Sequence, residues 1–259
     1  MPLQLNTTES GSGAPVAILH GLFGSARNWA SIAQRLAQRF HVIAFDMRNH
    51  GSSPWADTMS YPEMAEDVRA TLQARGITRC ALIGHSMGGK AAMLLALTHP
   101  ECVARLVVVD IAPAAYPPRH DPYVRAMRRL DLGALKRRAE ADQQLAVAVP
   151  DAPERGFLLQ NLVFDPGQPP RWRINLAAIG RAMPELVGTP TVPMGARYEG
   201  PALFVAGALS DYLRAEHEPA IHRLFPHARI ERVTAAGHWL HAEQPAVFLA
   251  LTEPFLTEG

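Results

Sequence analysis

The segment Ala81-Leu-Ile-Gly-His-Ser86-Met-Gly88 joins a short apolar run to a serine that stands between two glycines. The run has the composition of a buried strand, and the residues from Met87 to Thr98 have that of a helix. Gly84 and Gly88 fit the G-x-S-x-G pattern of a sharp strand-to-helix turn, which lifts a serine hydroxyl clear of the sheet. Small residues are needed there because the backbone of such a turn is strained. The segment therefore predicts a nucleophilic Ser86 at the carboxyl end of a strand.

Short β-branched runs alternate with amphipathic stretches on both sides of this segment. We expect strands at residues 16–20, 42–46, 81–84, 106–111, 202–206 and 230–234. We expect helices at residues 29–40, 61–75, 87–98, 216–224 and 243–256. The alternation predicts an α/β fold with a mostly parallel central sheet and helices on both faces, and a site at the carboxyl ends of the strands.

The alternation breaks between Pro113 and Pro201, where helical segments follow one another and no strand-like run appears. Proline and glycine, which interrupt regular structure, cluster at both ends of this region. We therefore expect a helical cap at residues 113–200, inserted into an α/β core that consists of residues 1–112 and 201–259.

Length and charge restrict the possible partners. The 259 residues suffice for one large hydrophobic core. Lys and Arg number 25 against 24 Asp and Glu, so the chain has no overall field that attracts nucleic acid or an anionic membrane. No apolar run reaches the length of about 20 residues that spans a bilayer. A small neutral molecule is the expected partner, and the oligomeric state stays open.

The cysteines and the first residues bear on the compartment. Cys80 and Cys102 lie in apolar runs, which favours buried free thiols over a disulfide or a zinc site. The first twenty residues lack the basic and apolar regions of a secretory signal. We therefore expect a cytoplasmic protein without a bound metal.

A serine hydroxyl is a weak nucleophile at neutral pH and needs a base, which a third group orients. In a strand-turn-helix site of this kind the base comes last along the chain. His238 directly follows the final expected strand, at the same sheet edge as Ser86, and is the predicted base. His241, three residues further on, is the weaker alternative.

Acyl transfer at Ser86 also requires two backbone N–H groups that bind the oxyanion. One is expected at Met87, directly after the serine, where the start of a helix favours negative charge. The other is expected in the loop after the first strand, with Leu22 as the donor and Gly21 allowing close approach.

Segments spread along nearly the full chain carry a family resemblance. They are His20-Gly-Leu-Phe-Gly-Ser25, Asp46-Met-Arg-Asn-His-Gly-Ser52, Gly84-His-Ser-Met-Gly-Gly-Lys90, Val109-Asp-Ile-Ala-Pro113, Phe157-Leu-Leu-Gln-Asn-Leu162, Trp172-Arg-Ile-Asn-Leu176 and Ala236-Gly-His-Trp-Leu-His-Ala-Glu243. In these segments the chain resembles the YbfF-type bacterial esterases and their mitochondrial abhydrolase-domain relatives. The resemblance implies an α/β-hydrolase fold with a small helical cap, no cofactor, and hydrolysis of short acyl esters or acyl thioesters through a Ser-His-Asp triad.

Two carboxylates compete to complete this triad. Asp211 follows the strand at residues 202–206, where most α/β-hydrolases place the acid, but there the acid usually stands three residues after a glycine. Three residues after Gly207 stands Ser210, which is a possible member of the same network. Asp110 ends the strand next to that of Ser86, and the resemblance favours it because the YbfF-type group keeps this Asp. We expect Asp110 to be the acid, with Asp211 as the competitor.

Other functions fit the same core motifs. Carbon–carbon bond hydrolysis or perhydrolysis would use the same triad, and a non-catalytic ligand receptor would keep the fold alone. A basic stretch of the cap is more typical of a solvated helix face than of a binding patch, although a preference for anionic acyl carriers such as coenzyme A is the alternative. This stretch contains Arg125, Arg128, Arg129, Lys136, Arg137 and Arg138.

Overall fold

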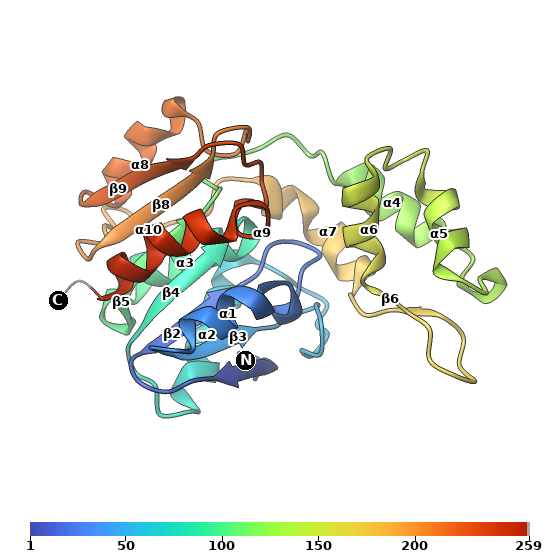
Figure 1. The fold of residues 1–259 in the computed structure, drawn as a ribbon, viewed down its shortest axis with the longest axis horizontal. Coiled ribbons are helices and arrows are strands. Elements are labelled where there is room, and N and C mark those ends of the chain that lie inside the picture. The colour runs from blue at the N-terminus through green and yellow to red at the C-terminus, as the bar shows by residue number, and fades with distance from the viewer. Residues whose placement is uncertain (258–259) are drawn as a thin grey trace.

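A seven-stranded sheet organises residues 1–257, the part of the chain that this computed structural model describes (Figure 1). Its strands are β1 (Thr7–Ser10), β2 (Pro15–Leu19), β3 (His41–Phe45), β4 (Cys80–His85), β5 (Val103–Val109), β8 (Ala202–Gly207) and β9 (Ala228–Val233). The order is β1-β3-β2-β4-β5-β8-β9, and neighbours are parallel except β1, which is antiparallel to β3. The predicted fold class is confirmed.

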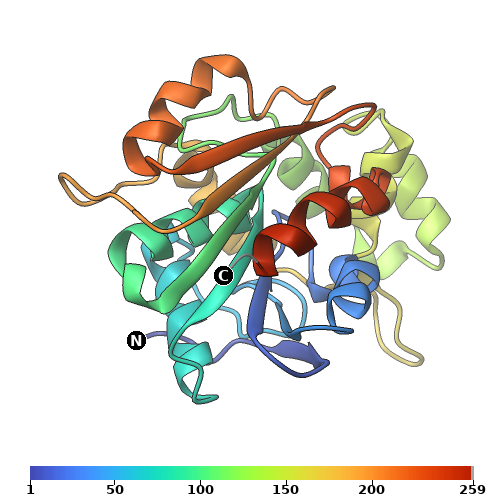
Figure 2. The same cartoon turned by 60° about the vertical axis from the view of Figure 1, so that its left-hand side comes forward.

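Helices cover both faces of the sheet (Figures 1 and 2). They are α1 (Ala30–Leu36), α2 (Tyr61–Gln73), α3 (Met87–Thr98), α8 (Glu218–Leu224), α9 (Leu240–Glu243) and α10 (Pro245–Thr257). In β2, Val16 and Ile18 belong to a buried cluster with α1 and α10. Ala17 and Leu19 point to the other face and join a cluster with α2 and α3. This burial on both faces explains why the central strands are continuous apolar runs.

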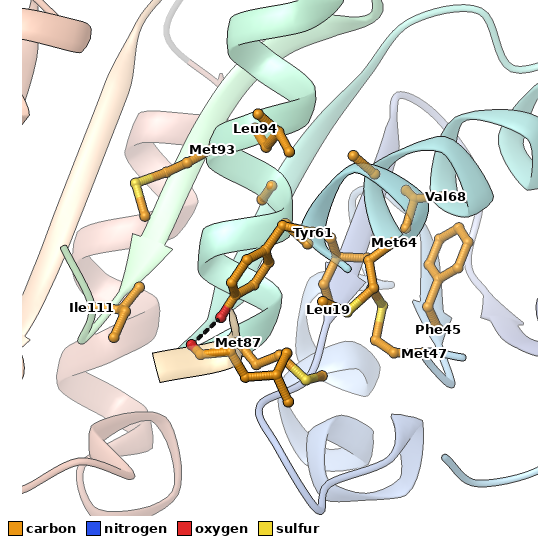
Figure 3. Close-up of a cluster of buried hydrophobic side chains, with 14 of the residues drawn as sticks. Leu19, Phe45, Met47, Tyr61, Met64, Val68, Met87, Met93, Leu94 and Ile111 are labelled. Carbon is orange, nitrogen blue, oxygen red and sulfur yellow. Dashed lines mark hydrogen bonds between the residues drawn. The ribbon is translucent and has the colours of Figure 1, made fainter. Parts of the chain in front are cut away.

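The cluster on the α2 and α3 side reaches the turn that carries Ser86. Figure 3 shows Met64 of α2 beside Leu19 of β2, Phe45 of β3 and Met47, which follows β3. The same view shows Tyr61 extending toward Met87. The Tyr61 hydroxyl donates a hydrogen bond of 2.7 Å to the carbonyl of Leu186. The core therefore continues without interruption to the base of the predicted site.

Sequence patterns predicted six of the seven strands of this sheet, namely the five interior strands and the edge strand β9, but not the other edge strand β1. Its residues, Thr7-Thr-Glu-Ser10, are polar and partly or fully exposed, so they show no apolar alternation. The expected helix at residues 243–256 is divided into α9 and α10, and Pro245 begins the second of these. Short 3₁₀ helices, which the patterns did not distinguish, are η1 (Ala26–Trp29), η2 (Pro100–Cys102), η3 (Leu132–Ala134) and η4 (Ala215–His217).

Between β5 and β8 the chain is mainly helical. It forms α4 (Asp121–Arg129), α5 (Arg138–Leu145), α6 (Ala152–Leu159) and α7 (Leu176–Val187). In Figure 1, α4, α5 and α6 are grouped beyond one end of the sheet. The expectation that this region contains no strand is wrong, because β6 (Leu162–Val163) pairs antiparallel with β7 (Arg171–Trp172). Two-residue strands carry no periodicity, so the sequence gives no signal for them.

The cysteines differ in exposure. Cys80 is buried in β4, whereas Cys102 is half-buried because it ends the surface helix η2, and both are free thiols. The expectation of two buried thiols is therefore wrong for Cys102. None of the helices in residues 1–257 combines the length and apolarity that crossing a bilayer requires.

Candidate active site

Ser86 occupies a strained turn between β4 and α3. Its φ is 51° and its ψ is −117°, in a region that residues with a side chain rarely adopt. A Cβ atom at Gly84 would collide with the carbonyl of Gly88, and one at Gly88 would collide with the carbonyl of Leu19. Both glycines of the sequence pattern are therefore required by the close approach of backbone to backbone.

Asp110 and His238 lie together at the same sheet edge. The Nδ1 atom of His238 is 2.7 Å from an oxygen of Asp110, whose side chain is fully buried. The carboxylate also accepts a hydrogen bond of 3.0 Å from the N–H of Gly207 and another from the hydroxyl of Ser210. Asp110 has a φ of 49°, so the backbone turns sharply at this residue to direct the carboxylate toward the histidine.

Asp211 lies away from this group. Its side chain is 56% exposed and forms ion pairs of 3.5 Å with Arg119 and 2.8 Å with Arg214. The structure therefore brings Asp110, and not Asp211, into contact with His238. β5 lies between β4 and β8, so the end of β5 is close to Ser86 on one side and to the Gly207 loop on the other.

The two histidines after β9 have different surroundings. The ring of His238 stacks on Tyr212 at 4.0 Å, and its carbonyl accepts a hydrogen bond of 2.8 Å from His85. His241 is buried and stacks on Trp29 at 4.0 Å, and within residues 1–257 its Nδ1 atom has no hydrogen-bond partner. Its geometry does not match that of an oriented base.

Burial controls the ionisation of the Asp110 and His238 pair. It lowers the pKa of the His238 imidazole below its ordinary value of 6.5, with a smaller contribution from His120. Burial also raises the pKa of the Asp110 carboxyl, while hydrogen bonds from Ser210 and Gly207 oppose that change. The imidazole is therefore neutral at neutral pH, which is the form that accepts a proton.

The loop after β2 approaches Ser86 closely. A Cβ atom at Gly21 would lie 2.7 Å from Nδ1 of His85 and 3.2 Å from Cβ of Ser86, so the backbone reaches the nucleophile because residue 21 is a glycine. Leu22 and Met87, the predicted oxyanion donors, line a common recess with Ser86. Met87 is the first residue of α3, and the first N–H groups of a helix have no partner within it.

Two neutral histidines support this loop. The N–H of Phe23 donates to Nε2 of His50 at 3.1 Å, and the N–H of Met47 donates to Nε2 of His20 at 2.9 Å. Burial lowers the pKa of both imidazoles, which keeps their Nε2 atoms available as acceptors. His20 thus braces the loop.

The Asp46-to-Ser52 segment is held by a buried ion pair. Nε and Nη2 of Arg48 contact the two carboxylate oxygens of Asp67 at 2.6 and 3.0 Å, and the side chains are 3% and 0% exposed. A bidentate pair of this kind fixes both orientation and distance. It anchors the segment beside the active site to α2.

We expect Arg48→Met to lower the free energy of unfolding by about 3–5 kcal/mol, because it leaves the Asp67 carboxylate buried without its cation. Urea denaturation measures this. The control is Arg69→Met, which breaks the partly exposed Arg69–Glu66 pair of 2.7 Å and should cost at most about 1 kcal/mol. Equal losses in the two variants would contradict the structural role of the buried pair.

Two recesses meet at Ser86. The first is lined by Gly21, Leu22, Phe23, Asn28, His120, Tyr123, Phe157, His238 and Trp239, among others. The second is lined by Tyr61, Met87, Lys90, Tyr116, Met183, Leu186 and Tyr212, among others. A substrate whose reacting carbonyl lies at Ser86 therefore has space for one group on each side.

Lys90 is a residue of the second recess that the sequence patterns did not single out. It lies one turn after Ser86 on α3 and is 1% exposed. Its ammonium donates to the carbonyl of Gly188 at 2.5 Å and lies 4.9 Å from the ring of Tyr116. Burial lowers the pKa of this group to about 7. The sequence signal that could have identified Lys90 was its position in the Gly84-to-Lys90 motif, four residues after Ser86.

The residues described above form a recognisable architecture. A mostly parallel sheet, with a serine at a strained strand-to-helix turn and a histidine after the last strand, defines the α/β-hydrolase class. The family model for the alpha/beta hydrolase fold matches residues 14–245. The chain belongs to this family.

Relatives with known names narrow the class. The chain is 45% identical over 248 residues to the sn-1-specific diacylglycerol lipase ABHD11 of Xenopus tropicalis, covering 93% of this chain and 77% of that protein. It is 35% identical over 246 residues to the esterase YbfF of Escherichia coli K12, covering 95% and 94% of the two chains. A solved marine microorganism esterase superposes with a TM-score of 0.94 at 39% identity, covering 98% of this chain and 100% of that one. The resemblance predicted from the sequence is confirmed, and the chain is a hydrolase of the esterase and lipase type.

Proposed function

We propose that this protein is a serine esterase or thioesterase with Ser86 as nucleophile, His238 as general base and Asp110 as the orienting acid. The observation that carries the proposal is the 2.7 Å contact between Nδ1 of His238 and the buried Asp110 carboxylate, in a histidine that shares a recess with Ser86. Since Nδ1 of His238 is hydrogen-bonded to Asp110, Nε2 is the ring nitrogen that takes the serine proton.

The reaction has two halves. In the first, Oγ of Ser86 forms a bond to the substrate carbonyl carbon, its proton passes to His238, and the N–H groups of Leu22 and Met87 hold the oxyanion. The bond from that carbon to the alcohol oxygen or thiol sulfur then breaks, and the leaving group takes the proton from the imidazole. In the second half, water attacks the acyl-enzyme by the same route and releases the acid.

The substrate class follows from the recesses. The second recess is walled by Tyr61, Tyr116 and Met183, which supports a short acyl group in van der Waals contact with apolar surface. The names of the relatives, an esterase and a lipase, support ester substrates. A panel of p-nitrophenyl esters and thioesters of graded acyl length tests this assignment, and we expect the highest kcat/KM at short chains. A maximum at long chains would contradict it.

Covalent labelling separates an enzyme from a ligand receptor on the same fold. A fluorophosphonate probe reacts with a serine only when a base and an oxyanion site activate it. We expect stoichiometric labelling of Ser86, slowed as long as an excess of a short acyl ester is present to compete for the site. A correctly folded protein that stays unlabelled would favour the receptor.

We expect the acid limb of kcat/KM for a neutral ester to have its midpoint below pH 6.5. Neutral His238 is the active form, burial lowers its pKa, and activity is therefore lost only as the pH falls through that lowered value. Lys90→Met is the control, because burial lowers the pKa of the Lys90 ammonium to about 7 and its titration lies close by. A midpoint above 6.5 that persists in Lys90→Met would assign the acid limb to the Asp110 carboxyl, whose pKa burial raises to about 7, and not to His238.

A further inference from the structure

A groove rich in arginine adjoins the first recess. Its wall includes Arg27 of η1, Arg138 at the start of α5, and Arg173 beyond β7, and none of the lining residues in the described part of the chain is Asp or Glu. The sequence pattern favours a solvated helix face for the basic stretch of the cap, and Arg138 is the member of that stretch that lines the groove. The other two arginines come from distant parts of the chain.

Two other arginines of the cap are paired with carboxylates. Arg155 pairs with Asp142 at 2.7 Å and Arg171 with Asp165 at 3.0 Å. Within residues 1–257, the guanidinium groups of Arg27 and Arg173 have neither a carboxylate nor a hydrogen-bond partner. Arg27 and Arg138 are exposed and Arg173 is half-buried, so water screens part of the repulsion between these like charges, and an anion bound in the groove neutralises the rest.

Arg138 is oriented by the protein. Its Nη2 atom donates a 2.7 Å hydrogen bond to the carbonyl of Leu162, which holds the guanidinium against the β6 segment. Its remaining donors stay available on the same planar fork. Guanidinium groups bind phosphate oxygens in this geometry through paired, charge-assisted hydrogen bonds.

The groove borders the candidate active site. Phe23 and Asn28 line both the groove and the recess that contains Ser86 and His238. The side chain of Asn28 donates to Gln160 at 2.9 Å, and that of Asn161 donates to the carbonyl of Phe23 at 2.8 Å. These bonds hold two lining residues of the groove, Gln160 and Asn161, to η1 and to the loop after β2. Leu162 and Val163 of β6, the strand labelled in Figure 1, also line the groove.

We propose that this arginine groove binds a phosphoryl group carried by the leaving alcohol or thiol of the substrate. The proposal rests on the proposed function, because it assigns the first recess to the leaving group and the recess of Lys90 to the acyl group. The groove then selects substrates by the charge of their phosphoryl group, which takes no part in bond breaking. It therefore acts on KM more than on the chemical step.

Four butyryl substrates test the groove. Butyryl-coenzyme A and 1-butyryl-glycerol 3-phosphate carry phosphate on a thiol and on an alcohol, and S-butyryl-N-acetylcysteamine and monobutyrin are their neutral counterparts. In Arg27→Ala/Arg173→Ala, we expect KM to rise by about tenfold or more for at least one phosphorylated substrate, with the neutral substrates unchanged. In the parent enzyme, that KM should also rise with ionic strength. Whichever phosphorylated substrate responds identifies the kind of leaving group.

The matched control is Arg129→Ala/Arg171→Ala, which removes the same charge from exposed positions outside the groove. It should leave all four substrates unaffected, and thermal melts should show all variants folded. The proposed role of the groove would be overturned by any of three results: an equal rise in KM for neutral and phosphorylated substrates, an unchanged KM for all of them, or the same rise in KM in the control variant. A parent enzyme that hydrolyses none of the four would instead contradict the proposed function itself, and the groove with it.

Discussion

Ser86→Ala is expected to lower kcat for p-nitrophenyl butyrate by about 10⁴ to 10⁶-fold, the size of loss that removal of a serine nucleophile causes. The variant removes the only atom that bonds to the substrate in the proposed mechanism, whereas it leaves the glycines of the turn in place. Fluorophosphonate labelling should disappear together with turnover. Residual turnover within about tenfold of the parent would exclude a serine mechanism.

The backbone of Ser86 supplies a control for folding. Because its φ is 51°, alanine at this position keeps the strain of the turn, whereas glycine relieves it. We therefore expect Ser86→Gly to be as inactive as Ser86→Ala but to melt at a higher temperature. An inactive pair with this order of stability shows that activity is lost through the hydroxyl and not through unfolding.

Asp110→Asn should lower kcat by about 10⁴-fold, because an amide at this position selects the wrong imidazole tautomer. The carboxylate accepts hydrogen bonds from the Gly207 N–H and the Ser210 hydroxyl in addition to its contact with His238. An asparagine that keeps the Gly207 bond through its oxygen presents its NH₂ group to Nδ1 of His238. The imidazole then carries its proton on Nε2, where the serine proton must arrive.

Asp211→Asn is the matched comparison, since Asp211 contacts two exposed arginines and not the histidine. Its kcat should stay within a few-fold of the parent. Asparagine tolerates the φ of 49° at position 110, so the fold of Asp110→Asn should survive, and a circular dichroism melt checks this. A large loss at Asp211 with near-normal activity at Asp110 would reverse the assignment.

Local sequence patterns were sufficient to predict the strained turn that carries Ser86 and the core strands. The apolar run before Ser86, its flanking glycines and the helix that follows are neighbours in the chain, so their spacing alone predicts the strained turn that the structure contains. The same holds for His238, which follows the last strand. Strands buried on both faces are continuous apolar runs, and they are therefore visible without any tertiary information.

The tertiary structure decided what depends on contacts between distant residues. Asp110 and His238 are 128 residues apart, and they meet because the loop after β9 passes over Gly207 at the end of β8, the strand beside β5, and the backbone turns at positive φ at Asp110. Asp211 follows β8, the strand after which most α/β-hydrolases place the acid of the triad. Its carboxylate is nevertheless held at the surface by ion pairs with Arg119 and Arg214. Arg27 and Arg173 come together in one groove by the same kind of folding. A pattern records spacing along the chain, whereas contact with a partner is set by strand order and by the direction in which each loop leaves the sheet.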